Sequence, residues 1–188
     1  AATDIYGKTS TEYKAAEASL TAVGITSNWS PSENSCACAA TVALSPEHAD
    51  VEATGATTTL GTLYAVRNRV LAATTAGIHY RTLYYQHSDA ISALLRNNDT
   101  LRRQGTGLLL VFGPGLHSLA AGRGNEQVIT AENTAAVLDY LAAIEQQAVA
   151  AGNLALANDI RVERTRIDWE RLPGMSFSAA WDYLNGLA

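Results

Sequence analysis

The two cysteines, Cys36 and Cys38, are the first residues that could do chemistry, because thiols form disulfides, bind metals and act as nucleophiles. In a helix, side chains two positions apart point about 200° away from each other, which excludes a disulfide or a shared metal ion. In an extended segment their Cα atoms lie about 6.5–7 Å apart, at the limit of disulfide geometry. The flanking alanines supply no cation to activate a thiol. Two small buried residues are the favoured interpretation, while a covalent link, a metal ligand or a nucleophile remain open.

The histidines form no recognisable metal motif. His79 and His87 are eight residues apart in a helical region, so they lie near one helix face but too far apart to chelate one ion directly. No H-E-x-x-H pattern occurs. A site made of His87, His117 and a cysteine would depend on tertiary contacts. We therefore predict no metal and no cofactor, and we keep His87 as a candidate binding residue.

Tyrosines gather beside an arginine in the middle of the chain. Tyr80 and Tyr84 are four residues apart on one predicted helix and are expected to pack into the core. Their hydroxyls are expected to bond to carbonyl groups or to Arg67. A ligand pocket lined by tyrosines is the alternative, so Arg67, Tyr80, Tyr84 and Tyr85 are candidate binding residues.

Apolar periodicity and capping residues predict an all-α fold, a compact multi-helix bundle with an irregular N-terminal arm and loops. Residues 1–35 are expected to form a helix and a polar loop that pack on the body, and residues 36–188 are expected to form the helical domain. Together they are expected to make one domain overall. Helices are expected at 60–74 and at 76–88. A further helix is expected at 89–98 with Ser88 as its cap, and another with Asp99 as its cap until Gly113-Pro114-Gly115 interrupts it. The last three are expected from a Thr130 cap up to Gly152, at 154–167 and at 176–186.

Composition limits the possible partners. The 188-residue chain has a net charge of −5, which argues against nucleic acid, because phosphate binding needs clustered Lys and Arg. Only 16% of its residues are charged, which suits close packing against copies or partners. No apolar run is long enough for a transmembrane segment. The chain starts at Ala1 without an initiator methionine, so we expect either a removed leader and export or a fragment of a longer protein.

The order of features from Cys36 to Gln104 resembles the CFI-box C-terminal domain of exported bacterial proteins. The shared pattern runs from CACAAT (36–41) through LYAVRNRVL (63–71) to GIHYRTLYYQHS (77–88). The chain differs from the family at Ala37-Cys38, where the family has Phe-Ile, at Asn68 instead of Asp, and at Asp89-Ala90 instead of Pro-Pro. The positions that match the family are Cys36, Ala39, Arg67, Gly77, Tyr80, Leu83, Tyr84, Tyr85 and Ser88.

The resemblance implies a helical module of exported proteins that has no firmly assigned catalysis. Together with the low charge, it predicts a non-catalytic module, secreted or exposed at the cell surface, that binds a protein partner or copies of itself. One alternative is a small secreted enzyme or metal-binding protein that uses Cys36, Cys38 and a histidine. The other is a small-molecule binder with a tyrosine-lined pocket.

Overall fold

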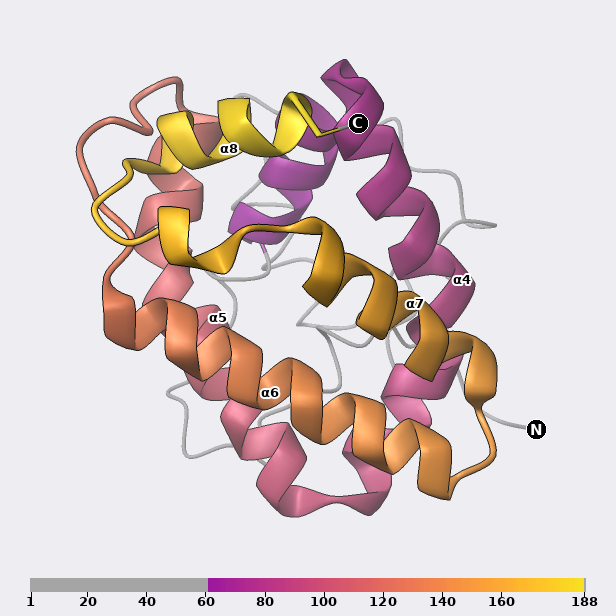
Figure 1. The fold of residues 1–188 in the computed structure, drawn as a ribbon. Helices are drawn as coiled ribbons and strands as arrows, with labels where there is room; N and C mark the ends of the chain where they lie inside the picture. The colour runs from indigo at the N-terminus through magenta and orange to yellow at the C-terminus, as the bar shows by residue number, and fades with distance from the viewer. Residues whose placement is uncertain (1–60, 188) are drawn as a thin grey trace, which may run out of the picture.

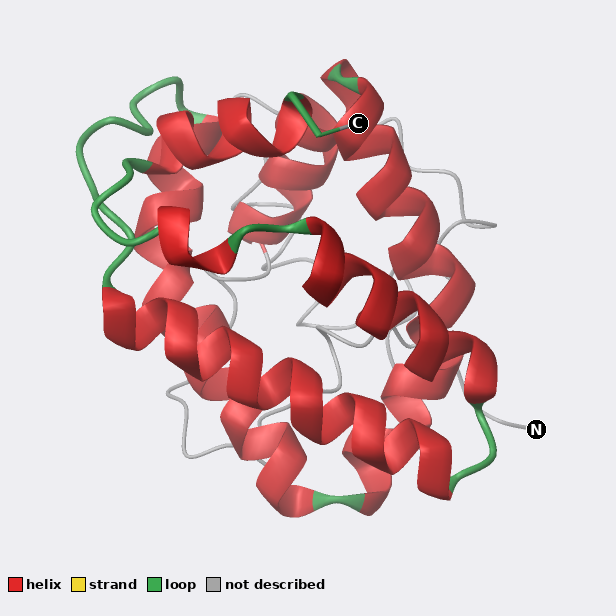
Figure 2. Cartoon of the chain, viewed as in Figure 1, coloured by secondary structure: helices red, strands yellow, loops and turns green. Residues whose placement is uncertain are grey.

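The computed structural model describes residues 61–187, which fold as an all-α bundle (Figures 1 and 2). Helix α6 and helix α7 lie side by side in Figure 1, with α5 behind α6, α4 along one flank and α8 across one end. The elements in chain order are η2 (Val66–Val70), η3 (Leu71–Ala73), α4 (Thr75–Asn97), α5 (Asp99–Ala120), α6 (Ala131–Ala150), α7 (Leu154–Arg166), η4 (Trp169–Arg171) and α8 (Phe177–Asn185).

Each of the five α-helices, α4 to α8, begins at a Thr, Asn or Ser whose side chain accepts a hydrogen bond from a backbone N–H in the first turn. The predicted Thr130 cap is confirmed, with the Asn133 N–H donating to Thr130 Oγ1 at 3.1 Å. Helices α5 and α6 are followed by Gly122 and Gly152, both with φ +74°, a left-handed conformation that glycine adopts without a Cβ clash. The helix boundaries thus follow local capping chemistry.

Two predicted caps are wrong. Ser88 starts no helix, because α4 runs without a break from Thr75 to Asn97 and buries Ser88 in its middle. The cap of α5 is Asn98, whose Oδ1 accepts from the Leu101 N–H at 3.0 Å, while Asp99 is the first helical residue and pairs with Arg102 at 3.0 Å. A capping residue type therefore marks a helix start only where the backbone before it leaves the helix.

Pro114 does not end α5, so the predicted interruption at Gly113-Pro114-Gly115 is wrong. A residue before proline is normally pushed out of helical geometry by a clash that involves its Cβ, and Gly113 has none. On the other side, a Cβ on Gly115 would lie 2.2 Å from the Phe177 ring, so α8 packs directly on the α5 backbone. This packing and the absent Cβ keep the helix continuous through the proline.

The segment before α4 is not one regular helix, as its apolar spacing predicted. Residues 61–65 are α-helical, η2 widens to a π-helix and η3 tightens to a 3-10 turn. Ala65, Val66 and Val70 are buried, whereas Arg67 is only half-buried. A π-helical turn changes the direction of its side chains relative to an α-helix, and such turns are frequent at functional sites.

Two apolar cores lie at opposite ends of the bundle. The first joins α4, α5, α6 and α7 through Leu95, Leu101, Ile144, Ala148, Leu156, Ala157 and Ile160. The second lies under α8 and the adjoining loops and contains Ile129, Ile167, Leu172, Phe177 and Ala180. Here Phe177 meets Phe112 of α5 edge to face, with ring centroids 5.9 Å apart. The loop between α5 and α6 makes one isolated antiparallel bridge, between Val128 and Ser176.

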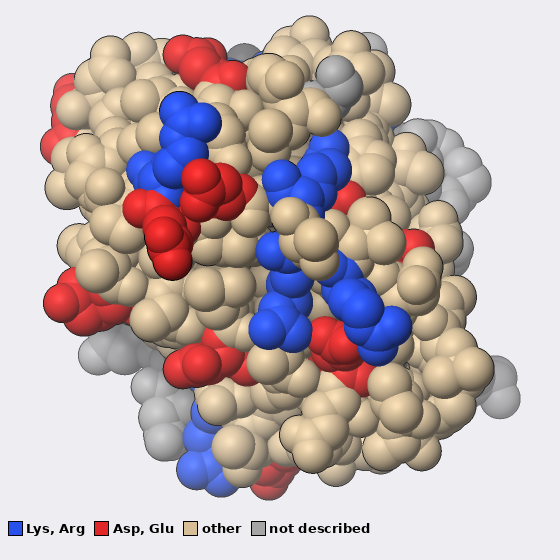
Figure 3. Space-filling model, in the orientation of Figure 1, with Lys and Arg blue, Asp and Glu red and all other residues tan. Residues whose placement is uncertain are grey.

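Ion pairs join α6 to α7 at the surface. Arg161 Nη2 and Arg164 Nη1 donate to the two oxygens of Glu145 at 2.9 and 2.8 Å. Acidic and basic side chains are interspersed on the face that carries these helices (Figure 3). The hydrogen bond from Arg161, followed by that from Arg164, lowers the pKa of Glu145 against the opposing effect of burial.

The predicted N-terminal arm, the 1–35 and 36–188 division and the cysteine segment lie wholly or partly outside the described residues. Among residues 61–187, no helix has a stretch long and apolar enough to cross a membrane.

Two glycines of α5 should respond in opposite ways to alanine. Gly115→Ala is expected to lower the free energy of unfolding by about 1–3 kcal/mol, because its Cβ would collide with Phe177. Gly107→Ala is the matched control: it lies in the same helix with no heavy atom within 4 Å of its Cβ. It should raise stability by about 0.5–1 kcal/mol. Urea unfolding measures both, and equal effects would contradict the close contact between α5 and α8.

The pair at Glu145 should stabilise the protein in a pH-dependent way. Because the pKa of Glu145 is lowered in the folded state, its contribution is present above its unfolded pKa of about 4.5 and is lost as the pH falls through the folded value. Glu145→Gln should therefore cost about 1 kcal/mol or less at pH 7, and this cost should shrink as the pH falls below about 4.5. The control is Glu126→Gln, whose pair with Arg123 is longer, at 3.6 Å. A cost for Glu145→Gln that persists undiminished at pH 2.5 would contradict this account.

Candidate functional site

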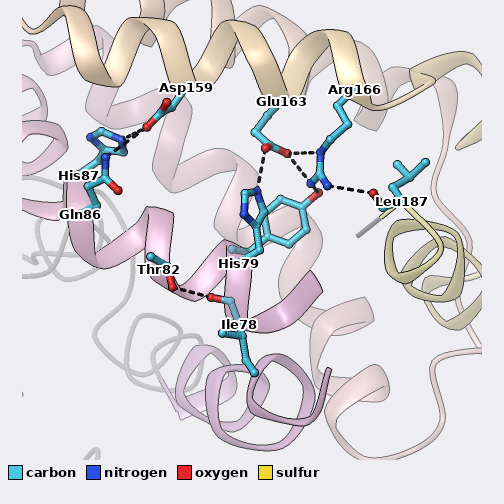
Figure 4. A network of polar contacts seen from close by, with 10 residues as sticks. Ile78, His79, Thr82, Gln86, His87, Asp159, Glu163, Arg166 and Leu187 are labelled. Carbon is cyan, nitrogen blue, oxygen red and sulfur yellow. Dashed lines mark hydrogen bonds and ion pairs between the residues drawn. The ribbon is translucent and has the colours of Figure 1, made fainter. Parts of the chain in front are cut away.

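Two histidines of α4 pair with two carboxylates of α7 (Figure 4). His79 Nε2 lies 2.9 Å from Glu163 Oε1, and His87 Nε2 lies 2.7 Å from Asp159 Oδ2. An ionised carboxylate only accepts, so Nε2 carries the hydrogen in both rings. The pairs run in opposite sequence directions, which makes α4 and α7 antiparallel where they meet. We call this set of contacts the α4–α7 network.

The network continues to a tyrosine of α4 and to the C-terminal segment. Arg166 donates from Nη2 to Glu163 at 2.7 Å and to the Tyr80 hydroxyl at 2.9 Å, and from Nη1 to the Leu187 carbonyl at 3.4 Å. Burial raises the pKa of Tyr80, and the positive charge of Arg166 partly offsets this. Burial alone would lower the pKa of Arg166, but its bonds to Glu163 and Tyr80 raise it overall. Tyr80 therefore stays a neutral hydroxyl beside a fixed guanidinium.

A hollow of about 630 Å³ lies beside this network, between η2 and α4. Two of its lining side chains are guanidinium groups and the others are hydroxyl or amide groups. We call it the η2–α4 hollow, and its lining residues are Arg67, Asn68, Arg81, Thr82, Tyr85 and Gln86. Gln86 connects it to the network, because its Nε2 donates to Asp159 Oδ2 at 3.3 Å.

Arg67 is held in the hollow by three neighbours. Its Nε donates to Asn68 Oδ1 at 2.9 Å and its Nη1 donates to the Tyr85 hydroxyl at 3.2 Å. Its guanidinium carbon lies 5.1 Å from the centroid of the Tyr64 ring, within the range of a cation–π contact. These contacts fix the plane of the guanidinium group at the wall of the hollow.

The structure divides the predicted binding residues between two places. Arg67 and Tyr85 line the hollow, whereas Tyr80 and His87 belong to the α4–α7 network. Tyr84 meets Tyr85 edge to face at 5.7 Å.

The expected tyrosine contacts are wrong in detail. Tyr80 is only half-buried, and its hydroxyl bonds to Arg166. The tyrosine hydroxyl that Arg67 meets is that of Tyr85, which is 45% exposed. The π-helical geometry of η2 and its docking on α4 decide this pairing, and neither can be read from the spacing of residues along α4.

No group of three or more His, Cys, Asp or Glu side chains that could hold a metal ion occurs within residues 61–187. Cys36 and Cys38 lie outside these residues, so their predicted roles stay predictions. His117 is exposed near the end of α5, away from the carboxylates that hold the other two histidines.

The α7 residues of the α4–α7 network were not predicted from the sequence. Asp159, Glu163 and Arg166 lie on α7, where acidic and basic residues are interspersed, a pattern typical of a solvated helix face. Their spacing of four and three residues places them on one face of α7, and this spacing is the sequence signal that could have indicated a shared contact. The spacing does not indicate which helix the three side chains contact.

The outward face of α5 carries no charge over a long stretch. From Gln104 to Gly122 the sequence contains no Asp, Glu, Lys or Arg. Leu110 is 39% exposed and Val111 is 54% exposed, and they lie between exposed Gly107 and Pro114 on the same face. We call this surface the α5 face.

No protein-family model, no curated protein and no solved structure matches the chain. The resemblance over Cys36–Gln104 therefore stays a prediction from the sequence.

A double-mutant cycle tests whether the α4–α7 network stabilises the fold. His87→Ala, Asp159→Ala and the double variant should give a coupling energy of about 1–2 kcal/mol at pH 7, because the histidine is buried and the contact is short. The control cycle uses Arg123 and Glu126, an exposed pair, and should give about 0.5 kcal/mol or less. Chemical unfolding provides both values, and similar coupling in the two cycles would contradict a specific role for His87.

Proposed function

We propose that this chain is a non-catalytic helical module that associates with a second copy of itself through the α5 face. The observation that carries this proposal is the exposed, uncharged surface around Leu110 and Val111. Its activity is thus binding and assembly, and no cofactor or nucleic acid takes part in it.

A second copy can pack on the α5 face without burying a charged side chain. The chain carries a net charge of −5, so two copies repel each other wherever acidic surfaces meet. The α5 face avoids that repulsion, and burying its side chains leaves no ion without a partner. Gly107 adds space, since nothing lies within 4 Å of a Cβ built there, and an approaching helix can come close to its backbone.

A binding role also agrees with how the described histidines are used. His79 and His87 are held by carboxylates that join two helices, and such pairs position elements of the fold. A catalytic histidine can also be held by a carboxylate, but it needs in addition a nucleophile or a bound substrate at its other ring nitrogen. This supports the non-catalytic proposal against an enzyme that uses these two rings.

Export from a bacterial cell, to the surface or the medium, is the second part of the proposal. It is supported by the sequence resemblance to exported proteins and by the low content of charged residues. An enzyme or metal-binding protein built on Cys36, Cys38 and a histidine is the alternative. Elemental analysis and thiol titration of the purified chain distinguish it, because bound metal or one reactive thiol would favour the alternative.

The oligomeric state tests self-association directly. Sedimentation velocity at about 100 µM, far above the Kd of a micromolar dimer, should show a dimer or larger species for the wild type. Val111→Lys should shift it to the monomer, because it places a charge in the centre of the contact. Val149→Lys is the matched control, since Val149 is similarly exposed, at 49%, on α6; it should behave as the wild type.

Two results would overturn the proposal. A wild-type chain that is monomeric at this concentration contradicts self-association and leaves the α5 face for a different protein. Equal dissociation by Val111→Lys and Val149→Lys shows that added charge, and not the α5 face, controls assembly.

A further inference from the structure

Within the described residues, the η2–α4 hollow combines two cationic side chains with neutral hydrogen-bonding groups. Arg67 comes from η2 and Arg81 from α4, and none of the lining residues among 61–187 is Asp or Glu. The chain as a whole has 18 acidic residues against 13 basic ones. Two arginines that share one hollow, with no acid beside them in the described part of the lining, therefore form a local positive site on an acidic protein.

These two arginines differ from those that hold the fold together. Arg102, Arg123, Arg161, Arg164 and Arg166 each pair with a carboxylate. Within residues 61–187 no ion pair involves Arg67 or Arg81. The positive charge of the hollow is thus not neutralised by the described part of the chain.

The orientation of Arg67 is set before any ligand arrives. Its bonds to Asn68 and Tyr85 use two of the five N–H groups of a guanidinium, and the rest remain available. A side chain already fixed in place loses little freedom on binding, which favours affinity.

Helix α4 supplies the remaining groups from one face. Arg81 and Tyr85 are four residues apart, as are Thr82 and Gln86, so these four side chains point to the same side of the helix. The contact between Gln86 and Asp159 ties this face to the α4–α7 network and limits the movement of Gln86.

We propose that the η2–α4 hollow binds a small organic oxyanion, a molecule that carries a carboxylate or a phosphate group. Guanidinium forks match the oxygens of both groups in two parallel hydrogen bonds. The volume of about 630 Å³ is that of a site for a small molecule and exceeds what a bare inorganic ion needs. The Asn68 amide nitrogen and the second N–H of Gln86 remain to donate to its other polar atoms, whereas the Thr82 hydroxyl already donates to the Ile78 carbonyl at 2.8 Å. This site is independent of the α5 face.

Isothermal titration at low salt with citrate, phenyl phosphate and inorganic phosphate tests the site. Citrate or phenyl phosphate should bind the full chain with a Kd of about 1 mM or lower. Arg81→Gln should weaken binding roughly tenfold, as expected for a lost hydrogen bond between charged groups. Tyr85→Phe keeps every charge but frees Arg67, and it should weaken binding a few-fold. Thermal unfolding checks that each variant is folded.

Arg103→Gln is the matched control, because it removes the same charge from an exposed position on α5 outside the hollow. It should leave the affinity unchanged. Binding of citrate alone or of phenyl phosphate alone supports the site and identifies the group as carboxylate or phosphate. Absence of binding for all three probes at about 10 mM overturns the proposal, as does an equal loss in Arg103→Gln, which would show general charge attraction.

Discussion

Helix α7 depends on charged side chains for its place in the bundle, and through them it joins α6 to α4. Only Leu156, Ala157 and Ile160 of this helix are buried, so its apolar contact with the core is narrow. On one side Arg161 and Arg164 bind Glu145 of α6, and on the other side Asp159 and Glu163 bind the histidines of α4. Because these pairs are directional, they fix the rotation and register of α7, which a small apolar stripe would specify weakly.

The polar contacts also explain why the candidate binding surface lies next to the network. One side of α4 meets α7 through His79 and His87, and the next side presents Arg81 and Tyr85 to the hollow. Gln86 lies at the boundary and belongs to both. Because the contacts with α7 fix the register of α4, the side of α4 that lines the hollow is held in place. The π-helical turn of η2 supplies Arg67 from the opposite side of the hollow.

Local sequence signals predicted helix ends correctly where capping by neighbouring residues determines them. Thr130 begins α6 and Gly186 follows α8, because capping needs only neighbouring residues. The signals failed where tertiary packing determines the outcome. Ser88 is buried inside α4, and α5 continues through Pro114, which follows Gly113 and precedes Gly115, on which α8 packs.

The candidate site was predicted less well for the same reason. Arg67 and Tyr85 were both candidates, but their contact depends on how η2 docks on α4. The partners of His79 and His87 lie 84 and 72 residues further along the chain, beyond the reach of spacing rules. These same separations have a consequence for the order of folding. The Glu145 contacts span only 16 and 19 residues, so the α6–α7 hairpin closes a short loop and can form early. The histidine contacts must then wait for α4 to dock on that hairpin. The contact between Arg67 and Tyr85 spans only 18 residues, so by the same rule we expect the η2–α4 hollow to close early and independently of the hairpin.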